Sequence, residues 1–321
     1  MIATNHARQF RIIWAPILAA VSVTAAGAQT GQAACDRACL NKLVDSYLAA
    51  LVAHDPSRVP MAADVKFVEN TVSMKPGEGL WKTASEAPTT FKIYVPDPVV
   101  GQVGFLGMMK EDDKPVELGL RLKVRDGQIT EAEHLLARNL SAGSLANLQQ
   151  PRPGLLATVP AAERVPRERM LKIGASYYTA LVESKGDAAP FADDCVRREN
   201  GMQTTGNPPV PGRGAMGITG SMSCHDQLNT RAMSYIKRIE PRRVQIVDME
   251  TGLVFGLSQF RHPMEEKTIN LVGVPGFDSM PMNFQPFDLP AAHIFKIRGG
   301  KIHEIEAMGF VMPYNSKTGW E

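Results

Sequence analysis

The sequence has few cysteines, few aromatic residues and no marked excess of charge of either sign. It contains 4 cysteines among 321 residues, 7% of the residues are aromatic, and 35 Lys and Arg stand against 33 Asp and Glu. A protein that binds nucleic acid needs a surplus of positive charge to contact phosphates, so we expect no nucleic-acid partner. The hydrophobic share of 44% is that of an ordinary globular protein, and the length favours two domains.

Sequence motifs for metal, nucleotide and serine-nucleophile chemistry are also missing. There is no HExxH, no pair of histidines four residues apart, no acidic calcium loop, no P-loop and no GxSxG. Residues 212–217 match GxGxxG, but prolines precede them where a nucleotide-binding fold has a strand, so we interpret the stretch as a loop. We therefore expect no metal site.

The first 28 residues have the pattern of a secretory signal. His6, Arg8 and Arg11 form a basic start, residues 12–26 are apolar, and small residues at 26–28 fit a cleavage site. The apolar stretch is short for a membrane span, so we expect no stable membrane anchor. Without Arg8 and Arg11 the 35 basic residues become 33, which equals the number of acidic residues. We expect the protein to be periplasmic or secreted.

The four cysteines are expected to form two disulfides, because an exported protein meets an oxidising compartment. Cys195 and Cys224 flank a loop rich in Gly and Pro, which favours a bond between them. Cys35 and Cys39 would then form the second pair. The spacing alone leaves the other two connectivities open.

An internal repeat divides the chain into two copies of one unit. Residues 46–70 align without a gap to residues 176–200, with ten identical positions out of 25. Residues 123–133 match residues 296–306 in a second shared stretch. The expected organisation is a signal at 1–28, a first domain at 34–138, a linker rich in Pro and Gly at 139–165, and a second domain at 166–321.

Each copy shows the same local order, a helix followed by strands. Apolar residues between Leu40 and Leu51 recur at helical spacing, which predicts an opening helix of about 15 residues with one apolar face. Residues 65–70 then read as a strand, and further strand patterns follow up to residue 134. A helix before an antiparallel sheet predicts an α+β unit that is used twice.

These patterns resemble a SnoaL-like domain of the nuclear transport factor 2-like superfamily. The resemblance rests on the helix ending at residues 47–51, the strand end at residues 68–70, and the closing Lys-hydrophobic-Arg-x-Gly-x-Ile pattern. The tandem arrangement, the disulfide expected in the second copy and residues 313–316 are similar to a group of largely uncharacterised exported double-domain proteins. The resemblance covers most of residues 35–320.

The resemblance implies two tandem cone-shaped domains, each an opening helix wrapped by a curved antiparallel sheet, with an apolar pocket at the open end. Enzymes of this superfamily typically need no cofactor, and they place a carboxylate or His beside a donor that stabilises an oxyanion. The implied function is a cofactor-independent lyase, isomerase or dehydratase that acts on a small, partly apolar molecule, aromatic or derived from a polyol. The alternative is an exported small-molecule-binding protein without catalysis.

Glu69 and Glu199 are the first candidates for the base. Val65, Phe67 and Glu69 alternate on one side of a strand, so Glu69 faces the cone if the apolar pair does. The same rule places Arg197 beside Glu199, where its charge would oppose a raised carboxyl pKa. Both glutamates could instead end their strands by bonding the backbone or an arginine, which would suit their presence in both copies.

Other side chains complete the predicted site. Tyr47 and Tyr177 lie on the opening helices and could donate a phenol hydrogen bond, although a tyrosine on such a face is often core. His134 ends the last strand of the first copy, near the expected pocket mouth. We expect the second copy to hold the site, because it alone carries Arg197 and a long loop at residues 202–223 that could act as a lid. The residues expected to contact substrate are Asn70, Asn200, His262, His293, Tyr314 and Trp320.

Overall fold

The computed structural model describes residues 1–2, 35–210, 212 and 214–321. Apart from residues 1 and 2, the predicted secretory signal at 1–28 lies outside these residues. In the described part of the chain, no helix has the length and apolar character needed to cross a membrane.

The first half opens with helix α1 (Arg37–Val52), as the apolar spacing predicts. Asp36 caps the helix, because its side chain accepts a hydrogen bond from the Cys39 amide at 2.8 Å. The buried face of the helix consists of Leu40, Val44, Tyr47, Leu48, Ala50 and Leu51.

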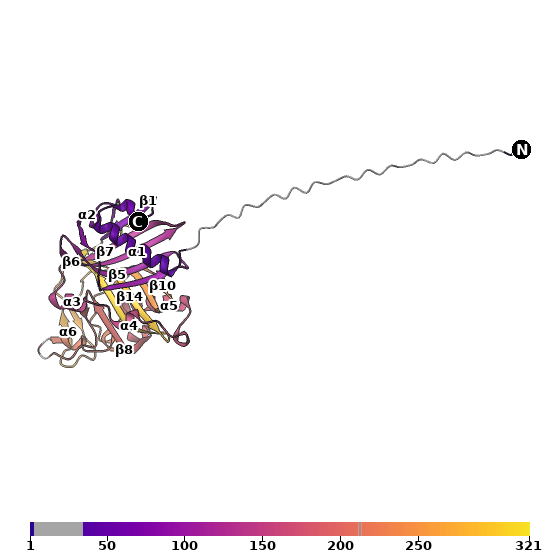
Figure 1. Cartoon of the computed structure of the whole chain (residues 1–321). Coiled ribbons are helices and arrows are strands. Elements are labelled where there is room, and N and C mark those ends of the chain that lie inside the picture. The colour runs from indigo at the N-terminus through magenta and orange to yellow at the C-terminus, as the bar shows by residue number, and fades with distance from the viewer. Residues whose placement is uncertain (3–34, 211, 213) are drawn as a thin grey trace. The chain divides into compact units, whose positions relative to one another are not determined.

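A seven-stranded sheet packs against α1 (Figure 1). Its strands run in the order β2-β1-β7-β6-β5-β3, and β4 pairs with β5. The strands are β1 (Met61–Glu69), β2 (Val72–Met74), β3 (Ala84–Glu86), β4 (Lys92–Asp97), β5 (Gln102–Glu111), β6 (Lys114–Arg125) and β7 (Gln128–Ala137). Two short helical segments complete the half: Pro56–Arg58 lies between α1 and β1, and α2 (Leu80–Thr83) lies between β2 and β3.

The second half repeats this plan with α5 (Arg167–Glu183) and a second seven-stranded sheet. The sheet order is β10-β11-β14-β15-β8-β9, and β16 pairs with β14. The strands are β8 (Phe191–Glu199), β9 (Met202–Gln203), β10 (Arg238–Asp248), β11 (Leu253–His262), β14 (Phe287–Arg298), β15 (Lys301–Gly309) and β16 (Met312–Pro313). Each half is thus an α+β cone in which a curved sheet wraps the opening helix.

The second half carries inserts that the first half lacks. They comprise α6 (Gly214–Thr219), α7 (Cys224–Asn229), and a small separate sheet of β12 (Thr268–Asn270) and β13 (Ser279–Pro281), whereas the helical turn at Gly186–Ala188 corresponds to Pro56–Arg58 of the first half. Residues 202–223 were expected to lack secondary structure, but they contain β9 and α6. The predicted linker at 139–165 likewise holds α3 (Ala142–Asn147), α4 (Pro153–Leu156) and a turn at Ala161–Glu163.

The expectation of a wholly antiparallel sheet needs one correction in each half. β1 pairs in parallel with β7, and β8 pairs in parallel with β15, whereas the longer neighbouring strands are antiparallel. A hairpin forces its two strands to be antiparallel, but β1 and β7 begin and end the half and are not joined by a turn. Their relative direction is therefore set by the path of the chain around the cone.

The two sheets meet through an apolar layer that includes Ile93, Leu106, Phe255 and Ile294. Gly104 on β5 is required there, because a Cβ atom at this position would lie 2.3 Å from the ring of Phe255. Figure 1 shows the first half, in indigo to purple, beside the second half, in pink to yellow.

Two ion pairs cross between the halves in a reciprocal pattern. Arg37 at the start of α1 donates to Asp248 at the end of β10, at 2.8 and 3.1 Å. Arg167 at the start of α5 donates to Asp97 at the end of β4, at 2.5 and 3.1 Å. Each opening helix is therefore tied to the sheet of the other half, so residues 35–321 form one compact unit.

Both predicted disulfides are present, Cys35–Cys39 and Cys195–Cys224. The second one joins β8 to the first residue of α7. It therefore holds an inserted helix against the strand that carries Arg197.

Candidate functional site

The cone of the second half encloses a cavity of about 140 Å³. Its wall is mostly apolar, with Leu181, Phe260, Leu289 and Ala307 among the lining residues. The polar side chains that reach the wall are Tyr177, Glu199, Asn200, Tyr235, His262 and His293. An apolar cavity with a few convergent polar groups is the usual form of a small-molecule site.

Four separate elements of the second cone supply these polar groups. Tyr177 lies on the buried face of α5, and Glu199 ends β8. His262 ends β11, and His293 lies in the middle of β14. The distances along the chain are large, so only the closed cone brings the four side chains to one cavity.

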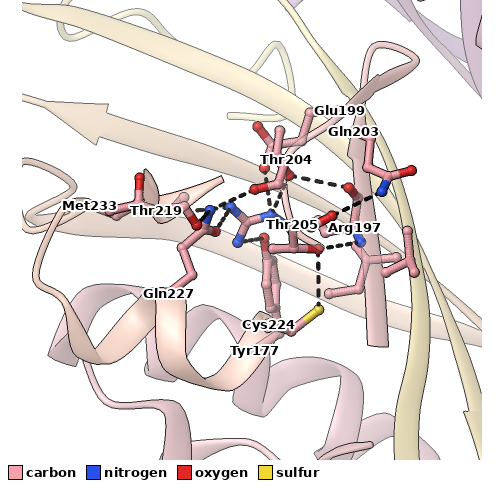
Figure 2. Close-up of polar contacts among 12 residues, drawn as sticks. Tyr177, Arg197, Glu199, Gln203, Thr204, Thr205, Thr219, Cys224, Gln227 and Met233 are labelled. Atoms are coloured by element: carbon pink, nitrogen blue, oxygen red, sulfur yellow. Dashed lines mark hydrogen bonds and ion pairs between the residues drawn. The ribbon is translucent and has the colours of Figure 1, made fainter. Parts of the chain in front are cut away.

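Arg197 lies between Tyr177 and Glu199 and contacts both side chains (Figure 2). Its side chain is fully buried, with Nε 3.1 Å from Glu199 Oε1 and Nη1 3.5 Å from Tyr177 Oη. Nη2 donates to Gln227 Oε1 on α7 at 2.5 Å, and Nε donates to Thr204 Oγ1 at 2.8 Å. A guanidinium only donates, so the Tyr177 hydroxyl keeps its own proton for another partner.

The two histidines of the cavity are neutral at physiological pH. Burial and, to a smaller extent, the charge of Arg197 lower the pKa of His293 to about 3. Burial likewise lowers the pKa of His262 to about 4. Among the described residues, Nδ1 of each ring has no hydrogen-bond partner although it is buried. An unpaired buried nitrogen is costly, so each ring is held in the cavity wall with one hydrogen bond unmade.

The phenols of the second cone are also neutral. Burial raises the pKa of Tyr177 to about 12, although the charge of Arg197 opposes the shift. Burial raises the pKa of Tyr235 to about 12 as well. Both hydroxyls therefore act as hydrogen-bond donors rather than as bases.

The equivalent polar groups of the first cone bind one another. His134 Nδ1 lies 3.1 Å from Glu69 Oε2, and His134 Nε2 lies 2.9 Å from the Tyr47 hydroxyl. A carboxylate only accepts, so Nδ1 donates to Glu69, and in a neutral imidazole Nε2 then accepts the proton of Tyr47. Glu69 also accepts from the Leu80 amide at 2.9 Å. The first cone therefore has a closed hydrogen-bonded chain, and the structural interpretation of Glu69 fits it.

The two cones differ in the residue that pairs with the glutamate across the two parallel strands. Glu69 pairs with His134 across β1 and β7, whereas Glu199 pairs with Ala307 across β8 and β15. The histidine of the second cone, His293, lies opposite Ala307 on the next strand. An imidazole between the tyrosine and the glutamate is thus replaced by a methyl group, and the space that remains forms part of the cavity.

Asn70 and Asn200 each join the end of one strand to a neighbouring strand by side-chain hydrogen bonds. Each has a positive φ, 45° and 47°, at the turn that follows the first strand. The side-chain oxygen of Asn70 accepts from the Leu136 amide at 2.8 Å, and that of Asn200 accepts from the Gly309 amide at 2.8 Å. Asn200 lines the cavity, but its amide is already occupied by the last strand.

Tyr314 and Trp320 are not among the residues that line this cavity. Trp320 lies over cationic groups of both halves, with Lys66 Nζ 4.6 Å, Arg121 Cζ 4.8 Å and Arg243 Cζ 5.4 Å from its ring centre. These contacts anchor the C-terminal tail.

Sequence reasoning missed Tyr235 and Gln227. Both belong to the insert of the second half, so the repeat offers no counterpart that could mark them. Their roles depend on the fold of α7, which carries Gln227 to Arg197, and on the segment after it, which brings Tyr235 to the cavity. In the described part of the chain, no group of three His, Cys, Asp or Glu side chains could hold a metal ion.

The family described as "Domain of unknown function (DUF8021)" matches residues 33–136 and 163–309. The chain belongs to this family. The two matched DUF8021 segments correspond to the two cones, and the segment between them holds α3 and α4. No curated protein matches the chain.

Two solved structures are similar to part of the chain. One is a "putative polyketide cyclase" from Xanthomonas campestris pv. campestris, with 18% identity and a TM-score of 0.27 over 44% of this chain and 90% of the other. The second is a "putative polyketide cyclase" from Silicibacter sp. TM1040, with 13% identity and a TM-score of 0.27 over 45% of this chain and 90% of the other.

Proposed function

We propose that the second cone is the active site of a cofactor-independent lyase, isomerase or dehydratase that acts on a small, partly apolar carbonyl compound. The observation that carries the proposal is the cavity in which Tyr177, His293 and Glu199 converge without bonding one another. The SnoaL-like resemblance of the sequence agrees with this reaction class. The two disulfides support action outside the cytoplasm, in the periplasm or after secretion.

Tyr177 and His293 would bind the carbonyl oxygen of the substrate. Both are neutral and both line the cavity, with ring centres 5.5 Å apart, and in the proposed complex one oxygen atom accepts a hydrogen bond from each. Neutral donors stabilise an enolate well, because they do not require a charged group to lose its solvation in an apolar cavity. Arg197 lies behind Tyr177 and strengthens the phenol as a donor.

Glu199 would serve as the base. Its carboxylate reaches the cavity wall from the end of β8, and Arg197 fixes its position. The carboxylate removes a proton from the carbon next to the carbonyl, and the electron pair moves into an enolate held by Tyr177 and His293. In a dehydration, the enolate then expels the hydroxyl group of the neighbouring carbon, which takes the proton from Glu199 and leaves as water. In an isomerisation, the enolate takes that proton back at another carbon.

Proton exchange in heavy water tests the proposal without knowledge of the natural substrate. We would incubate the protein with 2-butanone and with 4-hydroxy-2-butanone in D₂O and follow deuterium uptake and loss of water by NMR. Glu199→Gln and Tyr177→Phe should each lower the exchange rate about a hundredfold.

Glu69→Gln and Tyr47→Phe are the matched controls, because they make the same changes in the closed cone. They should leave the exchange rate of the folded protein unchanged. Equal losses in both cones, or no exchange in the wild-type protein, would contradict the proposal.

A binding protein without catalysis is the second candidate. The observation that favours it is the ion pair between Glu199 and Arg197, in which the carboxylate already has a partner and is 44% exposed. This alternative predicts that 2-butanone binds with an affinity that depends on Tyr177 while no deuterium enters it.

A further inference from the structure

A second, larger hollow of about 540 Å³ lies beside the cavity of the second cone. It is formed by the inserts of the second half, with α6 on one side and the segment that contains β13 on the other. Its principal lining residues are Met216, Tyr235, Phe277, Met280, Met282 and Phe287. We call it the outer chamber and the 140 Å³ cavity the inner chamber.

The two chambers share a wall. Tyr235 lines both of them. His262 of the inner chamber stacks on Phe287 of the outer chamber, with ring centres 4.1 Å apart and planes inclined by 11°. Tyr235 stacks on the same imidazole at 5.6 Å. The polar end of the site and the apolar hollow therefore adjoin at these three rings.

The outer chamber has the chemistry of an apolar ligand site. Among the residues that the structure describes, none that lines it is charged, and Ser279 is the only one besides Tyr235 with a polar side chain. Met216 is 65% exposed and Phe284 is 59% exposed at its edge. Clustered apolar side chains of this kind typically mark a surface that a ligand covers.

The outer chamber, at about 540 Å³, is much larger than the inner chamber, at about 140 Å³. A cavity of about 150 Å³ holds one molecule the size of benzene, so the inner chamber has room for a small reacting group and little more. The outer chamber falls within the range of about 300–1,000 Å³ that is usual for a complete ligand site.

We propose that the outer chamber binds the uncharged apolar tail of the substrate whose carbonyl end lies in the inner chamber. This inference rests on the proposed function and adds the substrate class: an amphipathic molecule with a compact polar head and an extended alkyl or aryl tail. Tyr235, His262 and Phe287 form the boundary between head and tail.

A series of methyl ketones from 2-butanone to 2-decanone tests the proposal. Each ketone carries the same head, and only the tail grows. Affinity for the wild-type protein, measured by ligand-observed NMR or calorimetry, should rise roughly two- to fourfold per methylene once the tail leaves the inner chamber. Phe284→Asp should abolish most of this gain and leave the affinity for 2-butanone unchanged.

Two further variants keep the test decisive. Met216→Asp alters a second exposed edge residue and should act like Phe284→Asp. Val99→Asp is the matched control, because Val99 is 76% exposed and lies on the first half, and it should keep the full gain.

The outcomes separate this inference from the proposed function. A flat series in the wild-type protein, or a gain that survives in both Asp variants, overturns the outer chamber as the tail site. Loss of deuterium exchange in Glu199→Gln together with a flat series would leave the proposed function standing. A chain-length gain that depends on Phe284, without any exchange, would support the tail site and contradict the catalytic proposal.

Discussion

The two cones share one helix-and-sheet plan, yet they use the same polar residue types in opposite ways. In the first cone, Tyr47, His134 and Glu69 satisfy one another in a fully buried chain. In the second cone, Tyr177 and Glu199 keep their places, but the position of His134 is occupied by Ala307. The second cone therefore has a cavity where the first cone has a closed hydrogen-bonded chain.

Arg197 is the second part of this difference. Arg197 occupies the position that Phe67 has in the first cone, so a charged side chain replaces an apolar ring. The insert supplies what that charge needs, since Gln227 and Thr204 accept its hydrogen bonds. A buried arginine without these partners would be strongly destabilising. The second half can therefore bury Arg197 beside the cavity because its insert supplies the hydrogen-bond acceptors.

The largest effect is expected when the second cone is made like the first. Ala307→His places an imidazole opposite Glu199, where it can bridge to Tyr177 as His134 bridges to Tyr47. The side chain would fill most of the inner chamber, so we expect proton exchange to fall at least about a thousandfold, to the background rate. Ala132→His, at another buried position of the first cone's last strand, tests whether any added imidazole has this effect. Retained exchange in folded Ala307→His would show that the inner chamber is not the site.

Opening the closed chain of the first cone should lower the stability of the protein and leave its activity unchanged. His134→Ala removes the central member of the closed chain, leaves the Tyr47 hydroxyl without its partner, and leaves Glu69 with only the hydrogen bond from the Leu80 amide. We expect a loss of about 3 kcal/mol in the free energy of unfolding, measured with urea. His54→Ala, which removes one exposed hydrogen bond to the Trp81 carbonyl, should cost about 1 kcal/mol or less. Equal losses in the two variants would argue against a stabilising chain in the first cone.

A smaller effect is expected on the free energy of unfolding at acidic pH. The pKa of His262 is lowered to about 4 in the folded protein, whereas an unfolded histidine has a pKa near 6.5. Between these values the unfolded state binds a proton that the folded state does not, so stability is lost as the pH falls from about 6.5 toward 4.

His262→Phe keeps the stack on Phe287 but removes this proton. The slope of unfolding free energy against pH should decrease by about 1 kcal/mol per pH unit in that window. His303→Phe is the control, since His303 lies outside the cavity and bonds to Asp194. An unchanged slope in His262→Phe would mean that His262 is not held neutral by burial.

Much of the fold follows from local pattern. The apolar spacing from Leu40 to Leu51 predicted α1, because a helix on a curved sheet must bury one continuous face. The internal repeat then predicted the second helix and the duplicated sheet without any further signal. The parallel pairing of β1 with β7 could not be predicted in the same way, since it joins strands that no turn connects.

The site was only partly predictable. Glu199, Tyr177 and Arg197 were accessible through alternation along β8 and the helical face of α5. The contrast between His134 and Ala307 depends on which residues pair across the parallel strands, and a sequence does not state that register. Tyr235 belongs to an insert whose path is fixed by tertiary contacts and by the Cys195–Cys224 bond.

The measurement that most directly tests the account is the structure of the protein crystallised with 2-decanone. The account predicts the ketone in the second cone, with its oxygen within hydrogen-bonding distance of Tyr177 and His293 and its tail between Met216 and Phe284. The first cone should keep the Tyr47–His134–Glu69 chain intact in the same crystal. A ketone bound in the first cone, or bound in the second with its oxygen away from Tyr177 and His293, would contradict it.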